Sequence, residues 1–146
     1  MILFASTFRF TPWELKMISL LLALAFTGVT SDQQLTQDYA TAYETSISEH
    51  KPLMVVVGAP WCPACRVLKE STIKPMAYSG QLDDVSLAII DKEASPDLVE
   101  ELTEGEKLLP QILVFTNEDG QWKRRKLPGY QTREGVRSLI DRALHK

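Results

Sequence analysis

Apolar residues recur along the chain with two different periods. Between residues 36 and 50 they fall at every third or fourth position, which places them on one face of a helix. Leu53 to Val57 is apolar at every position and rich in β-branched residues, which favours a strand buried on both faces. Continued along the chain, these patterns predict the order α-β-α-β-α-β-β-α. Helices are expected at 36–50, 62–74, 96–105 and 132–144, and strands at 53–57, 85–91, 111–115 and 122–127.

The connections between these segments predict a mixed sheet. The helix at 62–74 lies between two buried strands, and a strand–helix–strand unit places its two strands parallel. Asn117 to Gly120 is a turn sequence, so the last two strands should form an antiparallel hairpin. Pro75 should end or kink the helix before it, and Thr132 should cap the last helix. We therefore expect an α/β domain with a central mixed four-stranded sheet flanked by helices.

The N-terminal segment has the pattern of an export signal. Met17 to Val29 is a continuous apolar run, preceded by Arg9 and Lys16 and followed by polar residues. Its length suits a signal peptide better than a helix across a bilayer, and a buried core helix is the remaining alternative. We expect residues 1–31 to be a signal peptide, or an uncleaved signal anchor, and residues 32–146 to form the folded domain. That domain would be periplasmic or secreted, and tethered to a membrane only if the segment is not cleaved.

The charge balance excludes two classes of partner. The 146 residues are 45% hydrophobic and 24% charged, with a formal net charge of −3. Without a basic excess, we expect neither a nucleic acid nor an anionic membrane surface as the partner. The densest charge cluster, Lys123 to Lys126, indicates an edge strand protected from aggregation, or alternatively a docking patch for an acidic partner. The domain is expected to be a monomer.

Both cysteines of the chain lie at the start of the predicted helix 62–74, with two residues between them. The free N–H groups and the positive dipole end of a helix N-terminus stabilise a thiolate, which is the nucleophile in disulfide exchange. Cys62 should be the exposed attacking residue. Cys65, one turn further on, should be more buried and should resolve the mixed disulfide that Cys62 forms. Arg66 and Lys69 add positive charge nearby.

Three other interpretations of the cysteine pair compete with redox chemistry, and two inert thiols in an exported protein are the least favoured of them. A structural disulfide across two residues closes a very small loop, and such a loop adds little stability through entropy. A metal site usually has four ligands, and His50 and His145 are the only histidines in the chain. We therefore expect redox chemistry and no metal site.

The motif Trp61-Cys62-Pro63-Ala64-Cys65, the buried strand before it and Leu109-Pro110 before the third strand resemble the thioredoxin superfamily. The resemblance covers about residues 37–144 and implies a thioredoxin-like fold for the domain at 32–146. It also implies that Pro110 is cis and faces the cysteines. The backbone of Leu109 would pair with an extended substrate segment, and Trp61 would lie beside the reacting sulfur. The redox-active disulfide Cys62–Cys65 would serve without any other cofactor.

Some residues depart from the commonest thioredoxin pattern. Pro63-Ala64 stands where Gly-Pro is commonest, and this dipeptide should tune the chemistry of the pair. Val56 and Leu87 stand near the places where thioredoxins carry a buried aspartate and a lysine. The aspartate helps to deprotonate the resolving cysteine. Resolution here would depend on water or on substrate groups, and the sequence leaves the direction of electron flow open.

The motif and the resemblance together predict an exported thiol–disulfide oxidoreductase. It should exchange disulfides with protein thiols through Cys62 and Cys65 and should use a redox partner that the sequence does not identify. The alternative is a thioredoxin-like binding module, or a shuttle for a metal such as Cu(I), with little redox turnover.

Overall fold

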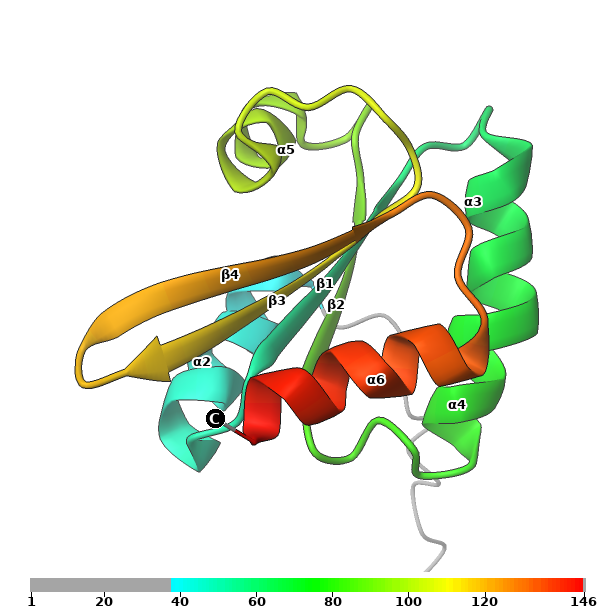
Figure 1. Cartoon of the computed structure of the whole chain (residues 1–146). Helices are drawn as coiled ribbons and strands as arrows, with labels where there is room; N and C mark the ends of the chain where they lie inside the picture. Colours follow the sequence, from blue (N-terminus) through cyan, green and yellow to red (C-terminus); the bar gives the residue numbers. More distant parts are fainter. Residues whose placement is uncertain (1–37, 146) are drawn as a thin grey trace, which may run out of the picture. The chain divides into compact units, whose positions relative to one another are not determined.

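A computed structural model describes residues 38–145 of the chain (Figure 1). The segment predicted to be a signal peptide, residues 1–31, lies outside the described residues. The order of helices and strands is the predicted one, with the second helix divided into three consecutive segments. The strands are β1 (Leu53–Gly58), β2 (Ser86–Asp91), β3 (Gln111–Glu118) and β4 (Gln121–Pro128). The helical segments are α2 (Tyr39–Glu49), α3 (Pro63–Val67), η1 (Leu68–Ile73), α4 (Lys74–Tyr78), α5 (Pro96–Thr103) and α6 (Arg133–Leu144).

The four strands form one mixed sheet in the order β2-β1-β3-β4. β1 is parallel to β2, with Val56 opposite Ile89, and antiparallel to β3, with Val56 opposite Ile112. β3 and β4 form an antiparallel hairpin. The predicted mixed four-stranded sheet is therefore confirmed, and β1 lies at its centre.

The hairpin is longer than the sequence pattern predicts. β3 continues to Glu118 and β4 begins at Gln121, so only Asp119 and Gly120 form the turn. Their φ angles are 53° and 84°, and two positive φ angles give a turn whose twist matches that of a hairpin. The residues beyond Phe115 are mostly polar, so the end of this ladder has no apolar period from which a strand could be predicted.

Helices cover both faces of the sheet (Figure 1). On one face η1, α4 and α6 contribute to a core whose buried members include Met54, Val56, Leu68, Ile73, Met76, Ile112, Val114 and Ile140. On the other face α2 and α5 contribute to a core with Ala42, Leu53, Val55, Val57, Val99, Leu102 and Leu113. A fully buried apolar side chain contributes about 1.5–3 kcal/mol by leaving water, so β1, buried on both faces, is firmly held.

The helix that follows the cysteines continues through Pro75 instead of ending there. The segments α3, η1 and α4 follow one another without a break, and the Lys74 N–H bonds to the Lys69 carbonyl, five residues back. A proline has no N–H, and its ring collides with the carbonyl four residues before it. The carbonyl four residues before Pro75 belongs to Ser71, within the wider π turn of η1, and this turn provides room for the ring. Thr132 caps α6 as predicted, because its side chain accepts a hydrogen bond from the Gly135 N–H.

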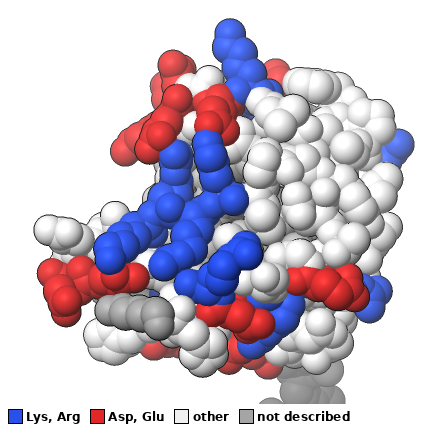
Figure 2. All heavy atoms as spheres, in the orientation of Figure 1, with Lys and Arg blue, Asp and Glu red and all other residues white. Residues whose placement is uncertain are grey.

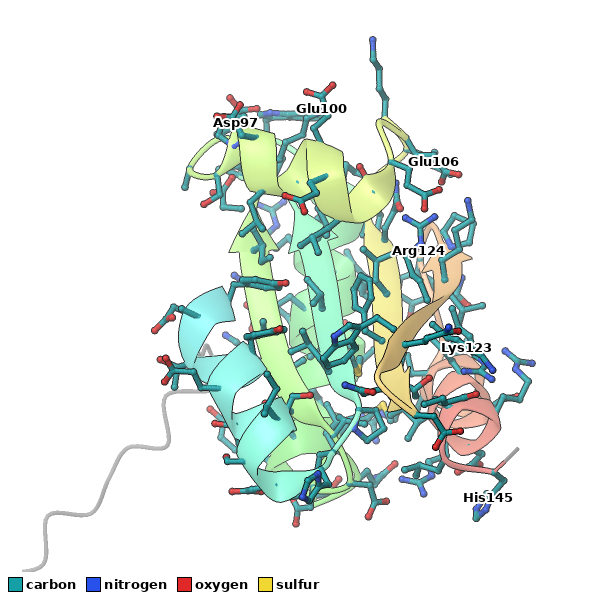
Figure 3. All side chains as sticks on the ribbon, turned by 90° about the vertical axis from the view of Figure 1, so that its left-hand side faces the viewer. Asp97, Glu100, Glu106, Lys123, Arg124 and His145 are labelled. Atoms are coloured by element: carbon teal, nitrogen blue, oxygen red, sulfur yellow. A yellow bond between two sulfur atoms is a disulfide. The ribbon has the colours of Figure 1, made fainter. Side chains whose placement is uncertain are left out.

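The charge cluster of β4 lies on an edge strand, as predicted. Figure 2 shows the basic side chains gathered over this strand with acidic side chains beside them. Arg124 donates to the Leu102 carbonyl at 2.7 Å and pairs with Glu104 at 2.6 Å. Lys126 pairs with Glu106, which Figure 3 shows at the same end of the sheet as Arg124. Two of the four cations therefore connect β4 to the end of α5 and the loop that follows it.

Candidate redox-active site

Cys62 and Cys65 form a disulfide at the start of α3, with their Cα atoms 5.3 Å apart. Cys62 is the N-cap of this helix, and its Sγ accepts a hydrogen bond from the Cys65 N–H at 3.1 Å. Pro63 occupies the first turn, where a proline loses no helical hydrogen bond. The Cys62 N–H in turn donates to the Ala59 carbonyl at 3.1 Å. The loop thus places the sulfur of Cys62 against the free N–H groups of a helix N-terminus, which favour a thiolate over a thiol.

The expected difference in exposure between the two cysteines is wrong for the oxidised pair. Cys62 is 6% exposed and Cys65 is 8% exposed. The two side chains cluster with Ala59, and Leu109 packs against this cluster from the opposite loop. Each sulfur also covers the other when they are bonded. The order of attack therefore rests on the position of Cys62 at the helix N-terminus and not on its exposure.

The loop opposite the disulfide contains a cis peptide bond between Leu109 and Pro110, so the prediction that this bond is cis is confirmed. Pro110 is buried and Leu109 is half-buried. The Pro110 carbonyl accepts a hydrogen bond from the Gly129 N–H at 2.7 Å. Within residues 38–145, neither the N–H nor the carbonyl of Leu109 has a hydrogen-bond partner. Both groups remain available to an added strand.

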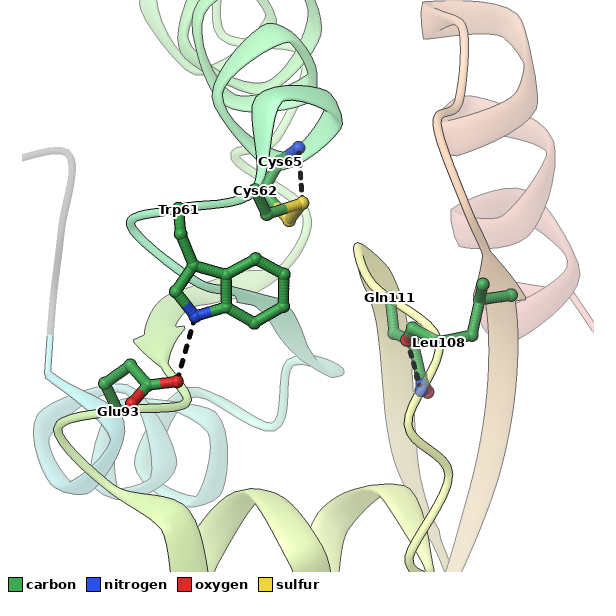
Figure 4. The surroundings of a disulfide bond; sticks show 6 residues. All are labelled: Trp61, Cys62, Cys65, Glu93, Leu108 and Gln111. Atoms are coloured by element: carbon green, nitrogen blue, oxygen red, sulfur yellow. Dashed lines mark hydrogen bonds between the residues drawn. A yellow bond between two sulfur atoms is a disulfide. The ribbon is translucent and has the colours of Figure 1, made fainter.

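Gln111 supports this loop from inside the protein, and sequence reasoning missed it. Its side chain is completely buried at the first position of β3. The amide group donates to the Leu108 carbonyl at 2.8 Å (Figure 4) and also to the Glu106 carbonyl at 3.4 Å. Its Oε1 atom has no partner in the part of the chain that the structure describes. The only signal in the sequence is a polar residue at the start of an otherwise apolar strand.

Trp61 lies beside the disulfide with 66% of its surface exposed. Its indole N–H donates to the Glu93 carboxylate at 3.0 Å, across the gap between the cysteine loop and the segment after β2 (Figure 4). The hydrogen bond fixes one end of a large apolar ring next to the sulfurs. Glu93 is a second residue that the sequence pattern did not indicate, because it is 32 positions away from its partner.

The two positions that lack the family's polar residues are apolar in the structure as well. Val56 is buried in the centre of β1, between Ile89 of β2 and Ile112 of β3. Leu87 is half-buried on β2 and packs against the same core. No proton acceptor for Cys65 can therefore come from either position.

The disulfide at a helix start, the cis-proline loop facing it and the central strand that leads to the cysteines form one arrangement. A family model described as thioredoxin-like matches residues 34–117, more than half of the chain. The chain belongs to this family. The resemblance noted in the sequence is confirmed, and a C-x-x-C pair in this fold supports thiol–disulfide exchange as the general class of chemistry.

This chain is also similar to individual thioredoxins, in sequence and in structure. A thioredoxin from Griffithsia pacifica is 28% identical over 75 residues, which are 51% of this chain and 65% of that relative. The chain thus spans slightly less than two thirds of that relative's length. A solved chloroplastic thioredoxin z has a TM-score of 0.60 at 19% identity, with 76% of this chain and 94% of that chain covered. A thioredoxin from Thermus thermophilus has a TM-score of 0.64 at 15% identity, with 75% and 85% covered. At these identities the solved structures show the thioredoxin-like fold.

Proposed function

We propose that this protein is an exported thiol–disulfide oxidoreductase that exchanges disulfides with protein substrates through Cys62 and Cys65. The observation that carries the proposal is the disulfide at the start of α3, opposite a loop in which the Leu109 backbone is free to bind. The two halves of that arrangement have separate roles, because the cysteines exchange electrons and the loop holds the substrate.

Substrate binding would occur by addition of a strand. An extended segment can pair with the free N–H and carbonyl of Leu109, as peptides do at exposed sheet edges. Trp61 is large and exposed beside the disulfide (Figure 4), and Leu109 packs against the cysteines from the facing loop, so both offer apolar contacts. Such a surface recognises backbone and shape more than side-chain identity. We therefore propose that the substrates are a broad range of protein disulfides or thiols.

The chemistry follows from two successive attacks. The Cys62 thiolate attacks one sulfur of a substrate disulfide, forms a mixed disulfide, and releases the other substrate sulfur as a thiolate. Cys65 loses its proton and attacks the Cys62 sulfur, and the bond between Cys62 and the substrate breaks. The substrate gains two electrons and the cysteine pair becomes a disulfide. Oxidation of a substrate dithiol is the same sequence in reverse, and a separate redox partner restores the starting state of Cys62 and Cys65.

Export is the part of the proposal that rests on the N-terminal sequence alone. The apolar run from Met17 to Val29, with basic residues before it, supports a signal peptide or an anchor. Among residues 38–145, none of the helices has the length and apolar character needed to cross a membrane. Expression of the full chain with fractionation and N-terminal sequencing tests export. A product beginning near Asp32 outside the cytoplasm is expected, and an intact chain in the soluble cytoplasmic fraction would contradict it.

The test of the chemistry is an exchange assay on the full chain with a peptide that contains one internal disulfide. Cys62→Ser should abolish exchange. Cys65→Ser leaves Cys62 as the sole cysteine of the chain, so it should accumulate an unambiguous mixed disulfide with the peptide. Equal rates for the wild type and Cys62→Ser would overturn the proposal. Tight stoichiometric Cu(I) binding by the reduced chain, without exchange, would favour the binding module instead.

The direction of electron flow depends on the reduction potential of the cysteine pair. This potential is measured by equilibrating the pair with glutathione buffers. Reduction potentials in this fold run from about −270 mV for a reductant to about −120 mV for an oxidant. Pro63 and Ala64 lie between the two sulfurs, so replacing them with Gly-Pro should shift the potential towards that of a reductant. An unchanged potential would show that this dipeptide does not tune the pair.

A further inference from the structure

A cavity of about 290 Å³ lies directly against the resolving cysteine. The central strand, the residues after it, the start of the helix, β2 and the cis-proline loop all contribute to its wall. Its lining residues are Val56, Val57, Gly58, Ala59, Pro60, Cys65, Arg66, Lys69, Ile89, Ile90, Asp91 and Pro110. Asp91 is the one carboxylate among these described residues. The volume is sufficient for several water molecules, since each occupies about 30 Å³ in the liquid.

The strand register explains why Asp91 faces the same side of the sheet as Cys65. A Cβ atom added to Gly58 would lie 3.1 Å from the Cys65 Cβ and 3.6 Å from its Sγ, so Gly58 faces this cysteine directly. Asp91 is the partner of Gly58 in the parallel pairing of β1 with β2. Residues side by side in a parallel pair project to the same face, with the strands about 4.8 Å apart. The carboxylate is thus one strand away from the backbone that touches the sulfur.

One oxygen of Asp91 is occupied and the other is free. Oδ1 accepts a hydrogen bond from the Glu93 N–H at 2.8 Å, which orients the side chain. Oδ2 has no hydrogen-bond partner within residues 38–145 and can bind a water molecule in the cavity. Asp91 is half-buried, so part of the cavity wall around it is shielded from bulk solvent.

We propose that Asp91 accepts the proton of Cys65 through cavity water and thereby enables the resolving step. The inference rests on the proposed disulfide-exchange function and deepens it. It assigns to β2 the proton-accepting role that Val56, in the centre of β1, cannot perform. The carboxylate lies two residues beyond Ile89, the β2 partner of Val56, on the same face of the sheet.

The proposed step balances as follows. In the mixed disulfide, the Cys65 thiol gives its proton to water, and that water gives a proton to the Asp91 carboxylate. The Cys65 thiolate attacks the Cys62 sulfur, the bond between Cys62 and the substrate sulfur breaks, and the substrate leaves as a thiolate. Asp91 then returns its proton through water to that thiolate or to solvent. In the oxidising direction, the protonated carboxyl instead supplies the proton to Cys65 as Cys65 leaves.

The charges around the cavity come from three segments. Arg66 of α3 and Lys69 of η1 line it and favour a thiolate on Cys65 through their positive charge. Lys92 and Glu93 follow Asp91 beyond the end of β2, and Glu93 directs its carboxylate to Trp61. β1 and the cis-proline loop contribute apolar side chains and backbone only. Asp91 is thus the acceptor that faces Cys65, and the two cations assist without accepting a proton.

The two attacks can be timed separately with 5,5′-dithiobis(2-nitrobenzoate) and the reduced full chain. Attack by Cys62 releases the first thionitrobenzoate, and resolution by Cys65 releases the second. Asp91→Asn keeps the Oδ1 acceptor for the Glu93 N–H, so the loop should remain intact while the proton acceptor is lost. At about pH 7 the second phase should slow by about tenfold or more, and the first should stay within about twofold. Above about pH 8.5, where a thiol ionises unaided, the variant should approach the wild type.

Controls separate a proton acceptor from a structural role. Asp97→Asn removes a carboxylate in the first turn of α5, away from the cavity, and should change neither phase. Asp91→Glu restores a carboxylate and should recover much of the second-phase rate near neutral pH. The wild-type profile is an independent measurement that needs no variant. Its second-phase rate should stay high below pH 8 instead of falling about tenfold per pH unit.

The outcomes distinguish this proposal from the function on which it rests. A fast second phase in the wild type with an identical pH profile in Asp91→Asn would overturn the role of Asp91 and leave disulfide exchange standing. A wild-type second phase no faster than that of Cys65→Ser would overturn both together.

Discussion

The two halves of the redox site are held in place in different ways. The cysteine half is local: the Ala59 carbonyl, the Cys62 N-cap and Pro63 lie within five residues of one another. The cis-proline half depends on distant segments, because Gly129 bonds to Pro110 and the cations of β4 pair with the loop before it. Electron exchange needs a local geometry, whereas substrate binding depends on parts of the chain that meet only in the folded protein. Variants that damage one half and spare the other test this contrast.

Gln111→Leu should give the largest difference between the cis-proline half and the cysteine half. This change removes the two hydrogen bonds that hold the Leu108 and Glu106 carbonyls, so the Leu109 backbone should lose its fixed position. Exchange with a disulfide-containing protein such as insulin should fall about tenfold, equivalent to about 1.4 kcal/mol, mainly through a higher KM. The first phase with 5,5′-dithiobis(2-nitrobenzoate) should stay within about twofold, because that small probe needs only the cysteine half.

Gln81→Leu is the control for that variant. Gln81 also donates from its side-chain amide, to the Ser79 hydroxyl, but it lies between α4 and β2, outside the cis-proline loop. It should leave the insulin KM unchanged. If Gln111→Leu slowed the reactions with insulin and with 5,5′-dithiobis(2-nitrobenzoate) equally, the two halves would not be separable.

The next effect is on stability and concerns the cations of β4. Arg124 bonds to the Leu102 carbonyl and pairs with Glu104, with its side chain only 18% exposed. Arg124→Ala should therefore lower the free energy of unfolding in urea by about 1 kcal/mol. Lys123 pairs with Glu118 with more than half of its side chain exposed, and Lys123→Ala should cost less than about 0.5 kcal/mol. If both variants lost the same free energy of unfolding, the connection between β4 and the end of α5 would have no special role in stability.

The smallest effect belongs to the helix behind the cysteine half. The hydrogen bond from Lys74 lowers the pKa of Glu70 below its ordinary value. A carboxylate whose pKa is lower in the folded than in the unfolded protein stabilises the fold above the unfolded pKa, and this stabilisation is lost as the pH falls. Glu70→Gln should therefore slightly lower the urea midpoint at about pH 7, and the difference from wild type should disappear at about pH 3. A difference that persists in acid would point to packing instead of charge.

The same contrast explains what the sequence could predict. The position of the cysteine pair at a helix start, the strand before it and the order of the elements depend on neighbours in the chain or on simple periods, and these predictions are confirmed. The cis bond at Pro110 could be predicted only through the family resemblance, because a proline alone at a strand start does not indicate a cis bond. Glu93 bonds to Trp61, 32 positions away, and Asp91 lines a cavity formed by several segments, so no local pattern marks either residue. The partners of Gln111 are only three and five residues away, but a polar residue at a strand start does not by itself indicate them.

One expectation failed for a related reason. The positions of Cys62 and Cys65 along the helix predict unequal exposure, yet burial is decided by the disulfide between them and by Leu109 from the facing loop. Exposure of a side chain is a property of everything that surrounds it. The spacing of two residues on a helix gives only their relative direction.

The π turn of η1 also sets the direction in which the cysteines point. Each residue of an α-helix advances the chain by about 100° around the axis, and a π turn takes up one additional residue without that rotation. α4 is anchored in the core by Met76, whereas α3 carries Cys65 against Gly58. If the same residues of η1 formed an ordinary α-helix, Cys65 would be rotated by about a quarter of a turn relative to α4. The angular alignment of the redox pair with the sheet is thus fixed one helical segment away from the sulfurs, by the same turn that accommodates Pro75.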